Sequence, residues 1–323
     1  MHTTASESIK KIRQIDFKKL GISEYNLLYI ERLLPHLDYY FDIYIQSISS
    51  FSTPTPNQSW IVDFGGGHGF LSIFLKSLGY NVIYCDINPL SVETIQAIKK
   101  ELNTGPDHIV LGSAAELKHF CDNNNIKPTH LIATDLIEHV FDLTVFFKDL
   151  RAINPHFEMV FTTASNPKNT YKCRQLRKYM KSQEIKYFSK RKEFISGQLP
   201  ELSEAEVENL ARLSRGETYS TIPQIVNQYK EDGILPEVLG DPYNTCDPEN
   251  GNWAERILSF EEYEKLAAQT GFQISFAPGY YNTKRPNKLV SSGLQALNSI
   301  IRSNRKVGFS LAPYIVIKLS NNL

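Results

Sequence analysis

Four glycines within residues 65–69 mark the part of the chain whose residue types point most directly to chemistry. They belong to the segment I-V-D-F-G-G-G-H-G-F-L at 61–71, in which an apolar stretch carrying one acid leads directly into the glycines. Glycine tolerates positive φ and lets a ligand approach the backbone closely, because it has no Cβ atom. A turn that opens a helix also presents unpaired N–H groups. The segment therefore predicts a nucleotide-like ligand at a strand-to-helix turn.

The spacing of these glycines excludes two common phosphate-binding motifs. A dinucleotide fingerprint that uses Gly65 and Gly67 would need a third small residue at position 70, which is Phe70. A P-loop would need Gly-Lys-Ser/Thr after the turn, and this sequence has none there. The pattern that fits is D-x-G-x-G-x-G, whose positions are Asp63, Gly65, Gly67 and Gly69, with Gly66 as an additional glycine.

A second acidic residue supports a ligand that contains adenosine. The next expected strand, N-V-I-Y-C-D, ends at Asp86, one strand after the glycines. A carboxylate there can accept hydrogen bonds from both ribose hydroxyls, each contributing roughly 1.5–3 kcal/mol. NAD enzymes place an acid in a similar position, so Asp86 alone does not choose between cofactors.

Together these features resemble motif I of the class I S-adenosylmethionine-dependent methyltransferases, whose turn accommodates an amino acid and a ribose. The resemblance covers residues 60–165 and 255–320. It implies S-adenosyl-L-methionine as the cofactor, with Asp63 near its ammonium end and Asp86 on its ribose. The further cofactor contacts that it implies lie at Gly65, Gly66, Gly67, Gly69, Ile87, Ser113, Ala114, Asp135 and Leu136. A purely structural glycine turn remains the alternative.

One of these positions departs from the family pattern. In the methyltransferases an Asp often occupies the position of Ser113 and contacts the adenine amino group. The Ser113 hydroxyl and the Ala114 backbone could provide this contact instead.

The resemblance also implies the fold, a doubly wound, mostly parallel seven-stranded α/β sheet whose last strand is antiparallel. Short apolar segments alternate with helical ones from residue 60 to 161, which independently indicates such a sheet. Strands are expected at 60–64, 81–85, 108–111, 130–134, 157–163, 272–277 and 313–319. Helices are expected at 69–78, 89–102, 113–122, 142–152, 203–214 and 260–270.

The chain is expected to divide into a core and two additions. Residues 1–55 are predicted to form an N-terminal helical cap, whose apolar stripe is interrupted at Pro35. Residues 56–165 and 255–323 are expected to form the Rossmann-like core. The alternation of strands and helices stops at 166–254, which is predicted to be a helical and loop insertion that forms a lid over the substrate.

The segment L-I-A-T-D-L-I-E-H-V at 131–140 carries the candidate catalytic residues. It is similar to the motif IV region of small-molecule methyltransferases, and an oxygen acceptor needs a base to remove its proton. His139 is the candidate base and Glu138 is its neighbour, although a structural role for both stays open. The D-x-x-E-H pattern also resembles a patch associated with a divalent metal in ubiquinone-pathway O-methyltransferases. Because that pattern usually starts with Glu, no metal site is predicted here.

Two segments are candidates for binding the methyl acceptor. Residues 168–192 contain ten Lys or Arg and one acid, so this basic run could bind an anionic small molecule. A solvated helix face explains the run equally well. Tyr243, Trp253 and Arg256 lie in or beside a long polar loop, where an aromatic side chain among polar ones suits a hydroxylated ring. They suit a packed loop anchor equally well.

The composition limits the kind of partner. The chain has 35 Lys or Arg and 35 Asp or Glu, and this balance argues against a protein that coats nucleic acid. The four cysteines form no C-x-x-C pair, which fits a reducing compartment. No segment is apolar enough to span a bilayer, and residues 1–20 contain no apolar signal-peptide region. A cytoplasmic protein without a membrane partner is expected.

The sequence thus predicts a methyltransferase that modifies a small molecule, on an oxygen of a glycan, nucleotide-sugar or secondary-metabolite precursor. Transfer to nitrogen or carbon, or to RNA through the basic insertion, is the alternative on the same core. A non-catalytic scaffold that binds the cofactor is the alternative from another class. Binding of the cofactor without turnover on any acceptor would distinguish the scaffold.

Overall fold

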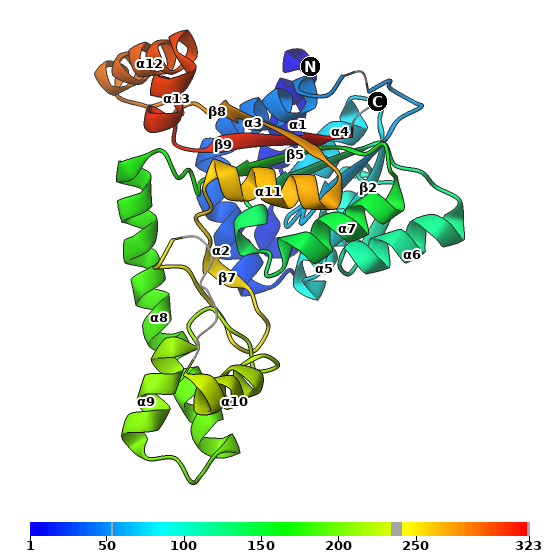
Figure 1. Ribbon diagram of the computed structural model, residues 1–323. Coiled ribbons are helices and arrows are strands. Elements are labelled where there is room, and N and C mark those ends of the chain that lie inside the picture. The colour runs from blue at the N-terminus through cyan, green and yellow to red at the C-terminus, as the bar shows by residue number, and fades with distance from the viewer. Residues whose placement is uncertain (53, 234–240, 322–323) are drawn as a thin grey trace.

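A seven-stranded sheet forms the centre of the protein (Figure 1). The computed structural model describes residues 1–52, 54–233 and 241–321. The strands are β1 (Trp60–Phe64), β2 (Asn81–Asp86), β3 (His108–Leu111), β4 (His130–Thr134), β5 (Glu158–Thr163), β8 (Gln273–Pro278) and β9 (Ile315–Ser320). Their order is β3-β2-β1-β4-β5-β9-β8. All run parallel except β9, which is antiparallel to β5 and β8, so the expected fold class is confirmed.

Helices cover both faces of the sheet. On one face lie α4 (Phe70–Ser77) and α5 (Pro89–Leu102), and on the other lie α6 (Ala114–Asn124), α7 (Leu143–Ile153) and α11 (Phe260–Thr270). Adjacent strand residues point to opposite faces, so Ile61 packs in the first core and Val62 in the second. Each of these elements begins and ends within two residues of the range predicted from the sequence.

Side-chain caps fix where several of these helices begin. The N-cap side chains of α5, α6, α7 and α11 accept hydrogen bonds from backbone N–H groups of the first turn, which have no partner within the helix. These residues are Asn88, Ser113, Asp142 and Ser259. Ser113 and Ser259 form complete capping boxes with a glutamate three residues later.

The N-terminal segment is helical and packs on the α4 side of the sheet. It contains α1 (His2–Arg13), a 3-10 helix (Phe17–Lys19), α2 (Glu24–Leu33), a 3-10 helix (Leu34–His36) and α3 (Leu37–Ser49). Pro35 lies in the second 3-10 helix, between α2 and α3, so the predicted interruption is confirmed. The ring of Phe41 on α3 packs 5.0 Å from the ring of Phe74 on α4, which joins this segment to the core.

The insertion is mainly helical and extends away from the sheet along its longest helix (Figure 1). It contains α8 (Thr170–Gln198), α9 (Glu204–Leu213) and α10 (Ile222–Asp232), followed by the two-stranded pair β6 (Thr245–Cys246) and β7 (Trp253–Glu255). Apolar residues of α8, α9 and α10 form a small core of their own, which includes Ile195, Val207, Leu210, Ile222 and Val226.

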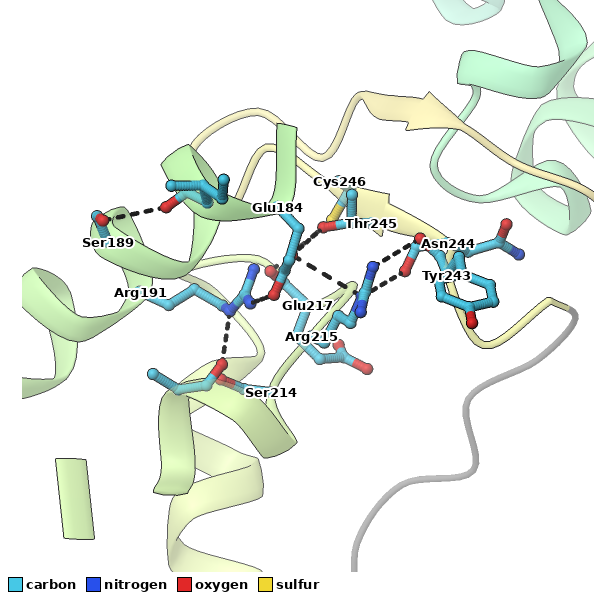
Figure 2. A network of polar contacts seen from close by, with 12 residues as sticks. Glu184, Ser189, Arg191, Ser214, Arg215, Glu217, Tyr243, Asn244, Thr245 and Cys246 are labelled. Atoms are coloured by element: carbon cyan, nitrogen blue, oxygen red, sulfur yellow. Dashed lines mark hydrogen bonds and ion pairs between the residues drawn. The ribbon is translucent and has the colours of Figure 1, made fainter. Parts of the chain in front are cut away.

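Acidic side chains of the insertion bind several cations of the basic run. Figure 2 shows Glu184 of α8 between Arg191, Arg215 and Thr245. Glu184 Oε1 accepts from Arg191 at 2.5 Å, and Oε2 accepts from the Thr245 hydroxyl at 2.5 Å. Further pairs join Arg177 to Asp241 and Lys190 to Asp247 and Glu249. These contacts favour a structural role for much of the run.

Two helices that the sequence did not predict lie between β8 and β9. They are α12 (Lys288–Ser303) and α13 (Arg305–Leu311), and α12 stands away from the sheet (Figure 1). Within the ranges that the structure describes, no helix is both long and apolar enough to cross a bilayer.

Candidate functional site

The glycine turn connects β1 to α4, and its glycines are required for different physical reasons. Gly65, Gly67 and Gly69 all have positive φ, which disfavours side chains. A Cβ atom on Gly69 would lie 2.1 Å from Ile95 Cδ1, so packing also excludes one. A Cβ atom on Gly67 would meet no heavy atom within 4 Å, so this backbone faces open space. Gly67 is therefore the position where a ligand can approach the turn.

Asp86, at the end of β2, is bound to the same turn. Its Oδ2 atom accepts from the Gly67 N–H at 2.8 Å, and Oδ1 accepts from the Asn88 N–H at 2.8 Å. The Tyr84 hydroxyl donates to the Gly67 carbonyl at 2.6 Å, which further fixes the turn. The next side chain, Ile87, is 72% exposed. A carboxylate and an apolar side chain therefore stand beside the open position at Gly67.

Asp63 points into the protein, towards α4. It is 2% exposed, and its Oδ2 atom accepts from the Ser72 N–H at 2.9 Å and from the Ser72 hydroxyl at 2.7 Å. Burial raises the pKa of Asp63 to about 7, the charge of Asp86 adds to this, and the bonds from Ser72 oppose it. The observed role of Asp63 is to hold the start of α4 against β1. Its contact with a cofactor ammonium group stays a prediction.

Ser113 and Ala114 lie at the start of α6, and the serine hydroxyl is occupied there. It donates to Glu116 Oε2 at 2.6 Å and accepts from the Ala115 N–H at 3.2 Å. Ala114 is buried. The observed role of Ser113 is therefore to cap α6. The adenine contact of these two residues stays a prediction.

Past the end of β4, an acidic residue has an unusual backbone conformation. Asp135 has a φ of 50°, and its N–H donates to the Thr162 carbonyl at 2.9 Å. Leu136 packs so closely on the glycine turn that a Cβ atom on Gly65 would lie 2.5 Å from its Cδ1 atom. Because β1, β2 and β4 are parallel neighbours, their carboxyl ends meet at one edge of the sheet. The structure therefore brings the β4 end to the glycine turn through Leu136, and the cofactor contacts of Asp135 and Leu136 stay predictions.

Hydrogen bonding assigns the tautomer of His139. Its Nδ1 atom lies 2.9 Å from the carbonyl oxygen of Trp253 on β7. A carbonyl can only accept, so Nδ1 carries the proton, and in the neutral ring Nε2 keeps its lone pair. His139 is thus held in the form that can accept a proton through Nε2.

Glu138 is the buried acid of this site. It is 2% exposed, and its Oε2 atom has no hydrogen-bond partner among the described residues. Burial raises the pKa of Glu138 well above its ordinary value, and the charges of Asp135 and Glu255 raise it further. The side chain of Asp135 is solvent-accessible, yet the surrounding protein and the charge of Glu255 raise its pKa as well. Within the described ranges, no group of three or more His, Cys, Asp or Glu side chains could hold a metal ion.

Glu255 belongs to this group of acids, and the sequence did not indicate it. It lies on β7 of the insertion, and its Oε2 atom accepts from the Ser165 hydroxyl at 2.8 Å. Ser165 follows β5, so this bond places an acid from the insertion beside the carboxyl ends of the central strands. Contacts between residues ninety positions apart leave no local pattern that could have revealed the site.

The N-terminal segment covers the glycine turn. The Asn26 side chain on α2 donates to the Leu90 carbonyl and to the Thr94 hydroxyl of α5, both at 2.8 Å. One helical turn later, the Tyr29 ring stacks 5.9 Å from the ring of His68. Burial lowers the pKa of His68 to about 3, and its Nδ1 atom accepts from the Phe70 N–H. His68 is therefore a neutral packing residue, and α2 rests directly on the turn.

Two of the three residues expected to bind the acceptor lie together. The Arg256 guanidinium stacks 4.8 Å from the Trp253 ring, and both side chains donate to the Phe141 carbonyl. They line a cavity of about 300 Å³. Tyr243 lies apart from this cavity, because its ring packs beneath Arg177 and Lys181 of α8. The structure thus separates Tyr243 from Trp253 and Arg256.

The sheet topology decides the fold family of this chain. The strand order β3-β2-β1-β4-β5-β9-β8, with β9 alone antiparallel, is the arrangement expected for the class I methyltransferases. The chain has the class I methyltransferase fold. The glycine turn and the β4 end lie at the carboxyl edge of its parallel strands, where such sheets bind ligands.

Comparisons with known proteins find similarity at the level of solved structures. No family model matches the chain, and no curated protein matches it in sequence. Phosphoethanolamine N-methyltransferase 2 from Haemonchus contortus, solved with S-adenosyl-L-methionine, is 12% identical, with a TM-score of 0.43 and coverage of 87% of this chain and 53% of that one. PKMT2 from Rickettsia typhi is 14% identical, with a TM-score of 0.43 and coverage of 84% and 50%.

A third similar structure has a more comparable length. This S-adenosylmethionine-dependent methyltransferase from Archaeoglobus fulgidus is 11% identical, with a TM-score of 0.38 and coverage of 92% of this chain and 94% of that one. The chain spans about half the length of the Haemonchus and Rickettsia proteins. A likeness at this level carries no information about the substrate.

Proposed function

We propose that the protein is an S-adenosylmethionine-dependent methyltransferase that transfers a methyl group to an oxygen of a small molecule. The observation that most supports this is the closeness of the glycine turn to the β4 end. Leu136 packs on Gly65, and the candidate base His139 follows three residues later. A donor-binding turn and a proton acceptor on adjacent loops are what methyl transfer to a hydroxyl needs.

The residues of the turn fit the cofactor. Gly67 leaves room for a ligand against its backbone, and the exposed Ile87 offers an apolar surface to the adenine ring. Each Asp86 oxygen accepts one backbone bond and retains a further lone pair for a ribose hydroxyl. The bonds from Gly67 and Asn88 hold this carboxylate in place, so its orientation does not depend on the ligand.

The reaction follows from these positions. When bound, S-adenosylmethionine would supply a methyl group whose carbon–sulfur bond breaks as a bond to the acceptor oxygen forms. The protein contributes orientation, which can lower a barrier by up to about 7–11 kcal/mol. His139 Nε2 accepts the hydroxyl proton, while Nδ1 donates to the Trp253 carbonyl. The negative charge of Asp135 stabilises the imidazolium that forms.

Transfer to an amine is a second candidate, and the acids favour it. Asp135, Glu138 and Glu255 gather at the end of β4, where His139 and Lys172 lower the pKa of Asp135 but do not outweigh its burial and the charge of Glu255. The carboxylates of Asp135 and Glu255 would attract an ammonium group, whereas burial favours the neutral form of Glu138. The product distinguishes the two candidates, since isotope-labelled methyl groups on oxygen and on nitrogen differ in chemical shift.

The ion pairs within the insertion argue against RNA as the methyl acceptor. Arg177, Lys190 and Arg191 of the basic run are bound to acids of the insertion, which leaves fewer free cations for a phosphate backbone. The scaffold alternative predicts cofactor binding without turnover. Mass spectrometry of cell extract incubated with the protein and a labelled methyl donor would identify any acceptor, and a modified product would exclude the scaffold.

Calorimetry tests the cofactor directly. S-adenosylmethionine and S-adenosylhomocysteine are expected to bind, and NAD is not. Asp86→Asn should weaken binding by about tenfold, because a charge-assisted hydrogen bond to ribose becomes a neutral one.

The control is Asp122→Asn, which changes an exposed carboxylate that pairs with Lys118 at the far end of α6. This variant should bind the cofactor as the unmodified protein does. Equal binding by Asp86→Asn and the unmodified protein would remove the cofactor assignment, provided that both have the same melting temperature.

A further inference from the structure

The helix α12 buries one part of its apolar surface and exposes the rest. Ile301 is 1% exposed, whereas apolar and small residues on the adjacent face are open to solvent. Leu289, Gly293, Ala296 and Ile300 recur at steps of four, three and four, so they share one face. All four are exposed, with Leu289 at 84%, and Val290 beside them is exposed as well. Val307 at the start of α13 adds to this apolar surface. A helix on a globular protein normally buries such a stripe.

Polar residues of α12 also face the protein, beside the buried Ile301. Gln295, Asn298, Ser299 and Arg302 line a cavity of about 480 Å³ between α12, α3 and residues 280–283. The Asn298 side chain there binds both the N–H and the carbonyl of Tyr281, each through a hydrogen bond of 2.8–2.9 Å. These bonds fix the rotation of the helix, so the exposure of its apolar stripe is built into the fold.

The charge around the stripe is entirely positive. Residues 279–323 contain no Asp or Glu. Lys284, Arg285 and Lys288 stand at the start of α12, and Arg302, Arg305 and Lys306 stand at its end. Cations thus flank the apolar stripe at both ends, and Lys284 alone among these six is paired with an acid within the described residues, which is Asp42 on α3 at 2.8 Å.

These observations distinguish between two partners that could cover the apolar stripe, a second copy of this chain and a membrane surface. A second copy of this chain, docked symmetrically, would bring the same patch against itself and oppose six cations with six. The surface of an anionic bilayer satisfies both features, because the headgroups attract the cations and the boundary of the acyl chains accepts the apolar stripe. We propose that α12 and the start of α13 dock the protein onto anionic membrane surfaces without crossing them.

Vesicle flotation tests this proposal with the full chain. The protein should float with vesicles of phosphatidylcholine that contain about 30 mol% phosphatidylserine, and at least about tenfold less with phosphatidylcholine alone. Raising the salt from about 0.1 M to about 0.5 M should weaken binding, because salt screens the headgroup charge. Lys288→Ser should lower the partition coefficient about fivefold, since one cation contributes about that factor.

Two variants at apolar positions distinguish the entry of apolar side chains into the membrane interface from the attraction between charges. Leu289→Ser combined with Ile300→Ser should lower partitioning by about tenfold or more, because two apolar side chains no longer enter the interface. Ile185→Ser is the matched control, since Ile185 is equally exposed on α8 among the cations of the basic run. It should partition as the unmodified protein does. Circular dichroism spectra should be the same for all variants.

Four outcomes would overturn the proposal. These are no flotation with anionic vesicles, equal flotation with neutral vesicles, full retention by the Leu289/Ile300 double variant, and loss of flotation in the Ile185 control. Alternatively, the unmodified protein could fail to bind vesicles and sediment as a dimer, while the double variant sediments as a monomer. That result would show that a second copy covers the stripe.

Discussion

At the scale of single residues, the candidate site is defined by hydrogen bonds that orient its groups in advance. The bond from His139 Nδ1 to the Trp253 carbonyl selects one tautomer, and two backbone N–H groups hold the Asp86 carboxylate. Neither arrangement needs a ligand to form. Pre-oriented groups lose little conformational freedom when a substrate binds, and this lowers the activation free energy of the reaction.

His139 can be tested apart from cofactor binding. His139→Ala should slow turnover by about a hundredfold or more, the usual contribution of a general base, while S-adenosylhomocysteine binds with nearly unchanged affinity. His119→Ala, a change at an exposed position on α6, is the control and should leave both measurements unchanged. Unaltered turnover in His139→Ala would exclude it as the base.

Asp63 should make the stability depend on pH. Its pKa is raised from 3.8 to about 7 in the folded protein, so between these values the folded state holds a proton that the unfolded state has lost. The free energy of unfolding should therefore fall as the pH rises through this window. Asp63→Asn keeps an oxygen that accepts from Ser72 but cannot ionise. The excess of its free energy of unfolding over that of the unmodified protein should grow by on the order of 4 kcal/mol across the window.

Urea unfolding of both proteins over a pH series measures this difference. Other buried acids, such as Glu138, titrate in both proteins and cancel in the comparison. Parallel curves for the two proteins would mean that Asp63 is already ionised throughout the window.

At the scale of secondary-structure elements, the insertion depends on one acid that serves several partners. Glu184 binds the fully buried Arg191 of its own helix and Thr245 of β6, and it faces Arg215 after α9 (Figure 2). Three segments therefore share one negative charge. Removing that charge leaves a buried guanidinium without a counter-ion, which is among the costly changes that a fold can undergo.

Glu184→Gln is accordingly expected to lower the stability of the insertion by about 3–5 kcal/mol. Hydrogen exchange should show faster exchange of amides in α9 and β6, while β1, β4 and β5 keep their protection. Glu208→Gln is the control, because this glutamate pairs with Arg212 on the exposed face of α9. A solvent-exposed pair of this kind contributes little to stability, so the control should exchange like the unmodified protein. Uniform loss of protection across the core would contradict a local role for Glu184.

The elements themselves were largely predictable from the sequence. Apolar runs fixed the strands, and caps such as Ser259 fixed helix starts, because both signals act within a few residues. The helix α12 was not predicted, since two serines and a glycine at 291–293 lower its propensity. The glycine spacing likewise indicated the ligand-binding turn. Glu255 and Asn26 could not be predicted, because their partners are remote in sequence.

At the scale of the whole molecule, three regions meet over the carboxyl edge of the sheet. The N-terminal segment reaches it through Tyr29 and Asn26 on α2, and the insertion reaches it through Glu255 on β7. The core supplies the glycine turn and the β4 end. Under the proposed function, the donor would bind to core residues covered by α2, and the acceptor would bind where Asp135 and Glu138 of the core meet Glu255 of β7. This division lets the acceptor change through the insertion without altering the cofactor turn.

The position of β9 has a consequence for how the protein is made. β9 lies between β5 and β8, and β8 pairs with no other strand of the described sheet. As the chain leaves the ribosome, β1 to β5 can assemble early, but β8 must wait until residues 315–320 emerge. During that interval one edge of β5 and both edges of β8 are unpaired, and open strand edges attract other chains. Synthesis that stops before residue 315 should therefore give an aggregating product, even though every residue of the candidate site is already present.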